Sequence, residues 1–151
     1  MSAAGPPYVA VIGAGDEVPT ELLADAEAVG AQLARRGAVV VTGGLGGVMA
    51  AACAGAGEAG GTTVGILPGD DRSQANRWVG VAVATGMGEL RNGLVVRSAD
   101  ALIAIGGEYG TLSEIALALK AGKRVVGLRT WEIAGVLAAS GPDEAVELAL
   151  G

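Results

Sequence analysis

Histidine and phenylalanine are absent from this chain of 151 residues, and cysteine occurs once, at Cys53. Without histidine, a His-based catalytic triad is excluded and an ordinary zinc site lacks its usual ligands, so we expect no metal site. A single cysteine cannot form an intrachain disulfide, which permits a reducing compartment. Aromatic residues make up 3% of the chain, so its core must be built from Ala, Val, Leu and Ile.

Long apolar runs and basic clusters are also missing. No stretch approaches the ~20 residues of a membrane span, and the N-terminus lacks the basic and apolar regions of a secretion signal. The formal charge is −6, and basic residues adjoin only at Arg35-Arg36 and Lys123-Arg124, which argues against a nucleic-acid partner. We therefore expect a soluble, cytoplasmic protein without membrane or nucleic-acid partners.

Short apolar runs alternate with helical patterns along the chain. The expected strands are Tyr8–Gly13, Ala38–Gly44, Thr62–Gly69, Ala101–Gly107 and Arg124–Leu128, with a weaker candidate at Trp78–Ala84. The expected helices are Pro19–Arg36, Gly46–Glu58, Met87–Ser98, Thr111–Ala121 and Gly141–Leu150. This alternation predicts an α/β fold, a single Rossmann-like doubly wound parallel sheet with helices on both faces, spanning residues 1–151 as one domain.

Four Gly-rich or polar loops follow these strands. They begin near Gly13, Thr42, Pro68 and Gly106, and in doubly wound folds ligands bind at the carboxyl ends of the strands. The loop "TGGLGGVM", Thr42 to Met49, could admit a phosphate against bare backbone. It is not a complete dinucleotide fingerprint, because Met49 stands where the third glycine would be. Tight turns in a glycine-rich protein are the alternative interpretation.

The stretch "GGEYGTLSE", Gly106 to Glu114, also has two interpretations. Thr111 and Glu114 have the spacing of a capping box, which would make Glu114 a structural residue at a helix start. Glycines before a helix also expose N–H groups to an anion, which would make this loop a site. Glu108 is unusual in such a cradle, since its carboxylate would repel a phosphate.

Arg91 and Asn92 lie on the expected helix Met87–Ser98. A solvated surface arginine is the ordinary interpretation of Arg91, and a fork for phosphate or carboxylate is the functional one. Asn92 is a mediocre helix former that could contact a ligand. With no histidine and no nucleophile elbow, any chemistry must be carried by carboxylates and arginines.

These two glycine motifs resemble those of the LOG ("Lonely guy") phosphoribohydrolases, often labelled lysine decarboxylases. "TGGLGGVM" is similar to their G-G-G-x-x-G-L-M, and "GGEYGTLSE" to their P-G-G-x-G-T-x-x-E. The chain departs from the family at four positions: Thr42 and Glu108 replace glycines, Gly106 replaces proline, and Asn92 replaces lysine. "ILPGDDRSQAN" and "TGMGELRN" resemble a branch similar to molybdenum-cofactor carrier proteins.

The resemblance implies a homodimer that cleaves the N-glycosidic bond of a nucleoside 5′-monophosphate without a required cofactor. By position it implies that Arg91 and Glu114 are catalytic. It further implies a ligand- and phosphate-binding set in which Gly107, Gly110 and Thr111 cradle the phosphate. The other members of this set are Gly13, Thr42, Gly43, Gly44, Gly47, Met49 and Asn92. The carrier branch implies the alternative of a non-catalytic carrier or sensor of a nucleotide-like or pterin phosphate, with the molybdenum cofactor as its ligand. Leu90, Leu94 and Val95 on the helix Met87–Ser98 could face a second copy or the core.

Overall fold

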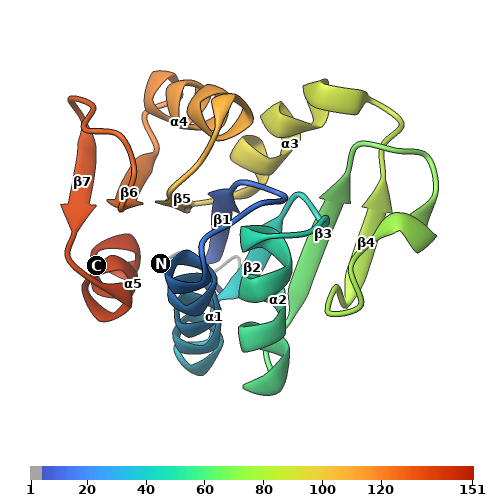
Figure 1. Ribbon diagram of the computed structural model, residues 1–151, viewed down its shortest axis with the longest axis horizontal. Helices are drawn as coiled ribbons and strands as arrows, with labels where there is room; N and C mark the ends of the chain where they lie inside the picture. The colour runs from blue at the N-terminus through green and yellow to red at the C-terminus, as the bar shows by residue number, and fades with distance from the viewer. Residues whose placement is uncertain (1–4) are drawn as a thin grey trace.

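The computed structural model describes residues 5–151, and its centre is a sheet of seven strands that all run parallel (Figure 1). In the sheet the strands stand in the order β4-β3-β2-β1-β5-β6-β7. In chain order they are β1 (Tyr8–Gly13), β2 (Val39–Thr42), β3 (Thr63–Leu67), β4 (Val81–Ala84), β5 (Ala101–Ile105), β6 (Arg124–Leu128) and β7 (Val136–Ala139). The central strands are apolar at successive positions, as strands covered on both faces must be.

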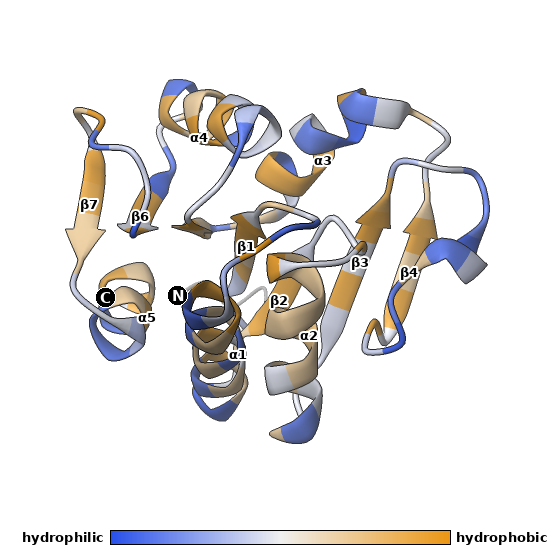
Figure 2. Ribbon diagram, viewed as in Figure 1, coloured by the Kyte–Doolittle hydropathy of each residue, from blue (hydrophilic) through white to orange (hydrophobic). Residues whose placement is uncertain are grey.

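Helices cover both faces of this sheet. They are α1 (Thr20–Arg35), α2 (Val48–Glu58), α3 (Arg91–Ser98), α4 (Tyr109–Lys120) and α5 (Pro142–Leu150), with 3₁₀ turns at Arg72–Gln74 and Gly88–Leu90. One core lies under α1, α2 and α5 and contains Val9 and Val11 of β1; the other lies under α3 and α4 and contains Ala10 and Ile12 (Figure 2). Successive residues of β1 therefore point to opposite layers.

Glycines allow α1 and α2 to cross at very short range. A Cβ on Gly30 would lie 2.0 Å from the carbonyl oxygen of Ala52, and one on Gly55 would lie 2.0 Å from that of Glu27. No side chain fits there, so the two helices meet backbone to backbone. This contact fixes the position of α2, whose N-terminus follows the glycine loop of residues 43–47.

The predicted parallel sheet with helices on both faces is confirmed, and the weaker strand candidate is real as β4. Two expectations were wrong. The sequence analysis did not include β7, which pairs with β6 at the sheet edge. It also began the fourth helix at Thr111, whereas α4 begins at Tyr109 with Glu108 as its N-cap residue.

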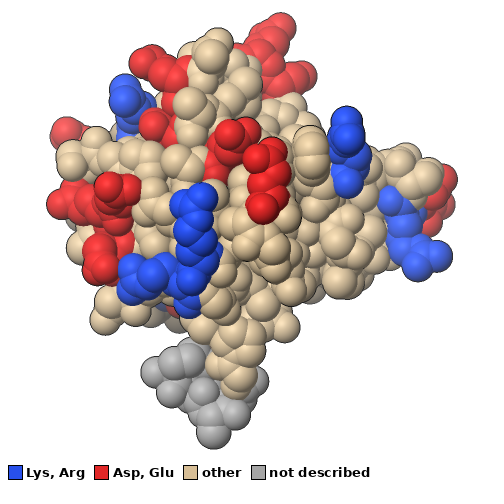
Figure 3. Space-filling view, turned by 90° about the horizontal axis from the view of Figure 1, so that it is seen from below, with Lys and Arg blue, Asp and Glu red and all other residues tan. Residues whose placement is uncertain are grey.

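The sequence analysis also expected no membrane span and no metal site. No helix among residues 5–151 is long and apolar enough to cross a membrane. The same residues include no group of three or more His, Cys, Asp or Glu side chains arranged to hold a metal ion. On the face drawn in Figure 3, basic side chains form small groups separated by acidic and uncharged ones.

Candidate functional site

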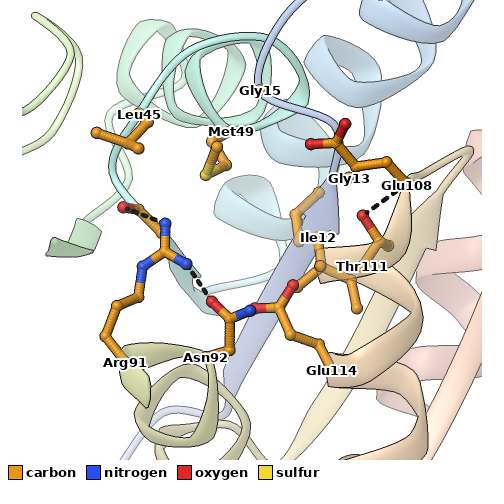
Figure 4. A pocket seen from close by; sticks show the side chains of 13 residues that line it. Ile12, Gly13, Gly15, Leu45, Met49, Arg91, Asn92, Glu108, Thr111 and Glu114 are labelled. Carbon is orange, nitrogen blue, oxygen red and sulfur yellow. Dashed lines mark hydrogen bonds between the residues drawn. The ribbon is translucent and has the colours of Figure 1, made fainter. Parts of the chain in front are cut away.

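A pocket of about 170 Å³ opens at the carboxyl ends of the strands, beside the point where the strand order reverses between β1 and β5 (Figure 4). Such reversal points are where doubly wound folds bind ligands. The pocket is lined from β1 and its loop, the β2–α2 loop, α3 and the start of α4. The lining residues are Val11, Ile12, Gly13, Gly15, Gly43, Leu45, Met49, Arg91, Asn92, Glu108, Gly110, Thr111 and Glu114.

Most of the predicted site residues meet in this pocket. Those that line it are Gly13, Gly43, Met49, Arg91, Asn92, Gly110, Thr111 and Glu114. Thr42, Gly44, Gly47 and Gly107 do not line it but shape its loops. The sequence analysis did not assign Val11, Ile12, Gly15, Leu45 or Glu108 to the site. Gly15, Leu45 and Glu108 stand within motifs that were recognised, whereas Val11 and Ile12 are ordinary strand residues with no distinguishing signal.

The β2–α2 loop is held in one shape by its own glycines and by two polar side chains. Gly47 has a φ of 59°, and a Cβ there would lie 2.2 Å from the carbonyl oxygen of Ala14. The hydroxyl of Thr42 accepts the N–H of Gly44 at 3.0 Å. From the β3–β4 connection, the amide of Asn76 donates to the carbonyl of Leu45 at 2.9 Å. Thr42 and Asn76 therefore position this wall of the pocket without lining it.

Arg91 is a fixed, half-buried side chain. Its Nε donates to the carbonyl of Ile66 at 2.9 Å and its Nη2 to that of Gly43 at 3.4 Å, while Nη1 donates to the side chain of Asn92. A Cβ on Gly43 would lie 2.6 Å from Nη2, so only glycine leaves room for the guanidinium. Burial lowers the pKa of Arg91, and nearby Glu114 opposes this effect. The interpretation of Arg91 as a solvated surface residue was wrong.

Asn92 connects Arg91 to the beginning of α4. Its Oδ1 accepts from Arg91, and its Nδ2 donates to the hydroxyl of Ser113 at 3.5 Å. Ser113 in turn donates to the carbonyl of Gly110 at 2.7 Å. Asn92 thus links the guanidinium of α3 with the glycine turn of α4, where the resemblance placed a lysine.

Glu114 is not part of a helix cap. The capping pair of α4 is Glu108 and Thr111, whose hydroxyl accepts the N–H of Glu108 at 3.3 Å, so the predicted Thr111–Glu114 capping box was wrong. Glu114 lies one turn further in, is 7% exposed, and lines the pocket. Burial raises the pKa of Glu114 to about 7, and the charge of Arg91 opposes part of that rise.

The pocket combines one guanidinium, two carboxylates and backbone from two glycine loops. In Figure 4 the Glu108 carboxylate lies near Gly13 and Gly15, whereas Glu114 and Arg91 project from α4 and α3. Glu108 is exposed, Arg91 is half-buried and Glu114 is buried. A carboxyl group with a pKa near 7 can accept or donate a proton at neutral pH, and a fixed guanidinium can bind an anionic or carbonyl oxygen. The arrangement suits a polar, partly anionic small molecule.

The glycine loops, Arg91 and Glu114 thus meet as the LOG motifs would require, and the chain matches the SLOG cluster4 family over residues 6–149. The chain belongs to this family. An uncharacterised protein of Archaeoglobus fulgidus is 47% identical over 139 residues, covering 91% of each chain.

Solved structures of molybdenum cofactor binding and carrier proteins are similar to the chain, in agreement with the predicted branch. The molybdenum cofactor binding protein of Rippkaea orientalis is 37% identical, with a TM-score of 0.92 over 97% of this chain and 96% of the other. The molybdenum cofactor carrier protein of Chlamydomonas reinhardtii is 35% identical, with a TM-score of 0.85 over 94% of each chain. The suspected likeness to LOG-like proteins and to cofactor carriers is confirmed.

Proposed function

We propose that this SLOG cluster4 protein binds the molybdenum cofactor, or a closely similar pterin phosphate, in the pocket between α3 and α4. The observation that carries this proposal is the 37% identity to a molybdenum cofactor binding protein over nearly the whole of both chains. The pocket supports it with a fixed guanidinium, Arg91, and with glycine loops into which a phosphate can approach closely.

The predicted site residues have separate roles in this proposal. Arg91, Asn92 and Glu114 contact the ligand with their side chains. Gly13, Gly43, Met49, Gly110 and Thr111 form the walls that the ligand touches. Thr42, Gly44, Gly47 and Gly107 hold the loops in place: at Gly107, with a φ of 131°, a Cβ would lie 2.7 Å from the Cβ of Thr111.

Retention of the cofactor tests this proposal directly. The purified chain is incubated with molybdenum cofactor released from a molybdoenzyme and passed through a desalting column, and bound molybdenum and pterin are measured. We expect about one cofactor per site, and a loss of roughly tenfold or more in affinity for Arg91→Ala, since charge-assisted hydrogen bonds are the strong ones. Arg97→Ala changes an exposed arginine of the same helix and serves as the control. Retention no better than that of serum albumin would contradict the proposal.

Hydrolysis of a nucleoside 5′-monophosphate is the second candidate function, and Glu114 is the observation that favours it. A buried carboxylate beside a guanidinium can stabilise the positive charge that develops on a ribose during cleavage and can orient the attacking water. In this reaction Arg91 binds the leaving part or the phosphate of the nucleotide. Both residues line one pocket, as the resemblance implied.

Release of free base from a panel of nucleoside 5′-monophosphates tests the second candidate. Turnover should disappear in Glu114→Gln, and kcat/KM should rise with pH up to about 7 because the base must be ionised. If the folded wild-type chain shows no turnover, hydrolysis is ruled out and only the carrier function remains.

We also propose that the chain forms a homodimer through the α3 side of the sheet. Val95 is buried in the core, whereas Leu90 and Leu94 are exposed, so only part of the predicted helix face is available to a partner. Val81 and Val83 of the edge strand β4 are also exposed, and their register with Val64 and Ile66 places them on the same face as α3. Apolar side chains gathered on one face are typical of an interface between copies.

The cytoplasmic location stays a prediction.

A further inference from the structure

The side chain of Glu114 is almost wholly buried and has no hydrogen-bond partner in the protein. It is 7% exposed, and among the described residues it takes part in no side-chain hydrogen bond or salt bridge. No fully buried side-chain oxygen or nitrogen in that part of the chain lacks a partner, so the carboxylate oxygens keep contact with the pocket space. Its polar atoms therefore face the pocket that it lines. A buried carboxylate without a partner is costly for the free protein, and hydrogen-bond donors on a ligand would remove that cost.

Arg91 sets the chemistry beside this carboxylate. A guanidinium has five N–H donors, and each of its three nitrogens already donates one hydrogen bond, to Ile66, Asn92 or Gly43. Donors remain for a ligand, but their position is fixed by these protein contacts. The part of the pocket lined by Glu114 and Arg91, called its floor below, thus offers the two oxygens of one carboxylate as acceptors, next to a guanidinium donor.

The ligand edge that matches this floor has two neighbouring N–H donors and then an acceptor oxygen. The 2-amino-4-oxo edge of a pterin has this pattern, and so does the corresponding edge of guanine. A carboxylate accepts the two adjacent N–H groups together, and the guanidinium donates to the oxygen. Adenine presents a different pattern, and hypoxanthine lacks the 2-amino donor.

Glu108 adds a reason to place the heterocycle, and not the phosphate, on this side. Two carboxylates, Glu108 and Glu114, line the α4 side of the pocket, whereas residues 43–47 of the β2–α2 loop carry no charged side chain. A phosphate at the start of α4 would meet like charge. The volume of about 170 Å³ is also below the roughly 300–1,000 Å³ of drug-sized ligand pockets. The enclosed part therefore holds one ring system, and the rest of the ligand extends toward the β2–α2 loop.

We propose that Glu114 and Arg91 select ligands by their 2-amino-4-oxo heterocyclic edge, and that the phosphate lies on the β2–α2 side. This inference rests on the proposed binding function, and it reverses the placement implied by the LOG resemblance, in which Gly107, Gly110 and Thr111 cradle the phosphate. Glu114 is the specificity-determining residue, and Asn92, which also lines the pocket, accepts a hydrogen bond from Arg91 and helps to hold it.

Guanosine and inosine 5′-monophosphate are suitable probes, since they differ only in the 2-amino group. We expect calorimetric titration of the full chain to give roughly tenfold tighter binding of the guanosine nucleotide, because one well-placed base contact discriminates by about that factor. In Glu114→Gln the ratio should fall to about one. Glu58→Gln, which changes an exposed carboxylate outside this pocket, should leave the ratio unchanged. A structure with bound guanosine 5′-monophosphate should place its phosphorus near residues 43–47.

The pH dependence gives a second readout. The groups that face Glu114 are Arg91 from α3 and Glu108 from the start of α4; the β1 and β2–α2 walls contribute no titratable side chain. The affinity ratio of the two nucleotides should rise with pH through about 7 as Glu114 ionises. The ratio cancels titration of the phosphate, which both nucleotides carry.

Each outcome separates this inference from the function on which it rests. Equal affinity for the two nucleotides, a ratio insensitive to Glu114→Gln, or a phosphate at Gly110 and Thr111 would overturn the inference while leaving binding intact. Failure to bind either nucleotide together with failure to retain the molybdenum cofactor would overturn both.

Discussion

Glu114 is a residue of the candidate site that lowers the free energy of unfolding at and above neutral pH, where its buried carboxyl group ionises. Its carboxyl group is almost wholly buried, and Arg91 compensates for only part of the lost solvation, so the pKa of Glu114 rises from 4.5 to about 7. An acid whose pKa is higher in the folded state binds more protons folded than unfolded between these two values. Its contribution to stability is therefore complete below about pH 4.5 and is lost as the pH rises toward 7.

Replacement of Glu114 by Gln should remove this pH dependence. At pH 8 the variant should be more stable than the wild type by up to roughly 3 kcal/mol, since each pH unit of pKa change corresponds to about 1.4 kcal/mol. At pH 4.5 the two should differ little. Urea denaturation of both proteins across this range measures the difference. Parallel stability curves would contradict the assignment of Glu114 as the buried titrating group.

Gly43 is the residue that leaves space for Arg91. A Cβ at this position would lie 2.6 Å from Nη2 of Arg91 and 2.8 Å from the sulfur of Met49. Gly43→Ala should therefore displace the guanidinium and weaken ligand binding about tenfold or more. The effect on stability should be smaller, because both contacted atoms belong to long side chains and not to the backbone. Titration with the molybdenum cofactor, alongside thermal unfolding, separates the two effects. Unchanged affinity would show that Arg91 does not need this position.

At the scale of elements, the crossing of α1 and α2 provides a matched pair of glycines on one helix. A Cβ on Gly55 would meet the backbone of Glu27 at 2.0 Å, whereas one on Gly57 would have nothing within 4 Å. Gly55→Ala should destabilise the chain by about 3 kcal/mol, because backbone cannot move as a side chain can. Gly57→Ala should stabilise it by about 0.5–1 kcal/mol, because alanine is the better helix former. Chemical denaturation of the two variants checks both signs.

The elements also mark where the sequence was sufficient to predict structure. The central strands are apolar at nearly every position, as β5 is throughout, and glycines end most of the expected runs, so the central sheet and its ligand edge could be predicted. β7 is a half-exposed edge strand with the sequence Val-Leu-Ala-Ala, and such a run fits a helix as well as a strand. The start of α4 was predicted wrongly because two pairs, Thr111–Glu114 and Glu108–Thr111, both have the three-residue spacing of a capping box. Only tertiary packing selects between them.

At the scale of the whole molecule, the number of copies that assemble decides whether one chain contains the complete site. The α3 side of the sheet carries exposed apolar side chains close in sequence to Arg91, the most prominent being Leu90, which is 73% exposed. If this face joins two copies, then each pocket lies beside the interface, because Leu90 directly precedes the guanidinium that lines it. Ligand binding and dimer formation would then be linked, and each would strengthen the other.

Leu90→Glu tests this arrangement. We expect the wild-type chain to have the mass of a dimer in size-exclusion chromatography with light scattering, and the variant to have the mass of a monomer, since two carboxylates would be buried across a symmetric contact. Leu137→Glu places the same change on β7, where Leu137 is also exposed, and should leave the dimer intact. Dissociation should also weaken binding of guanosine 5′-monophosphate. A wild-type monomer, or a Leu90→Glu dimer, would show that the α3 side is not the interface.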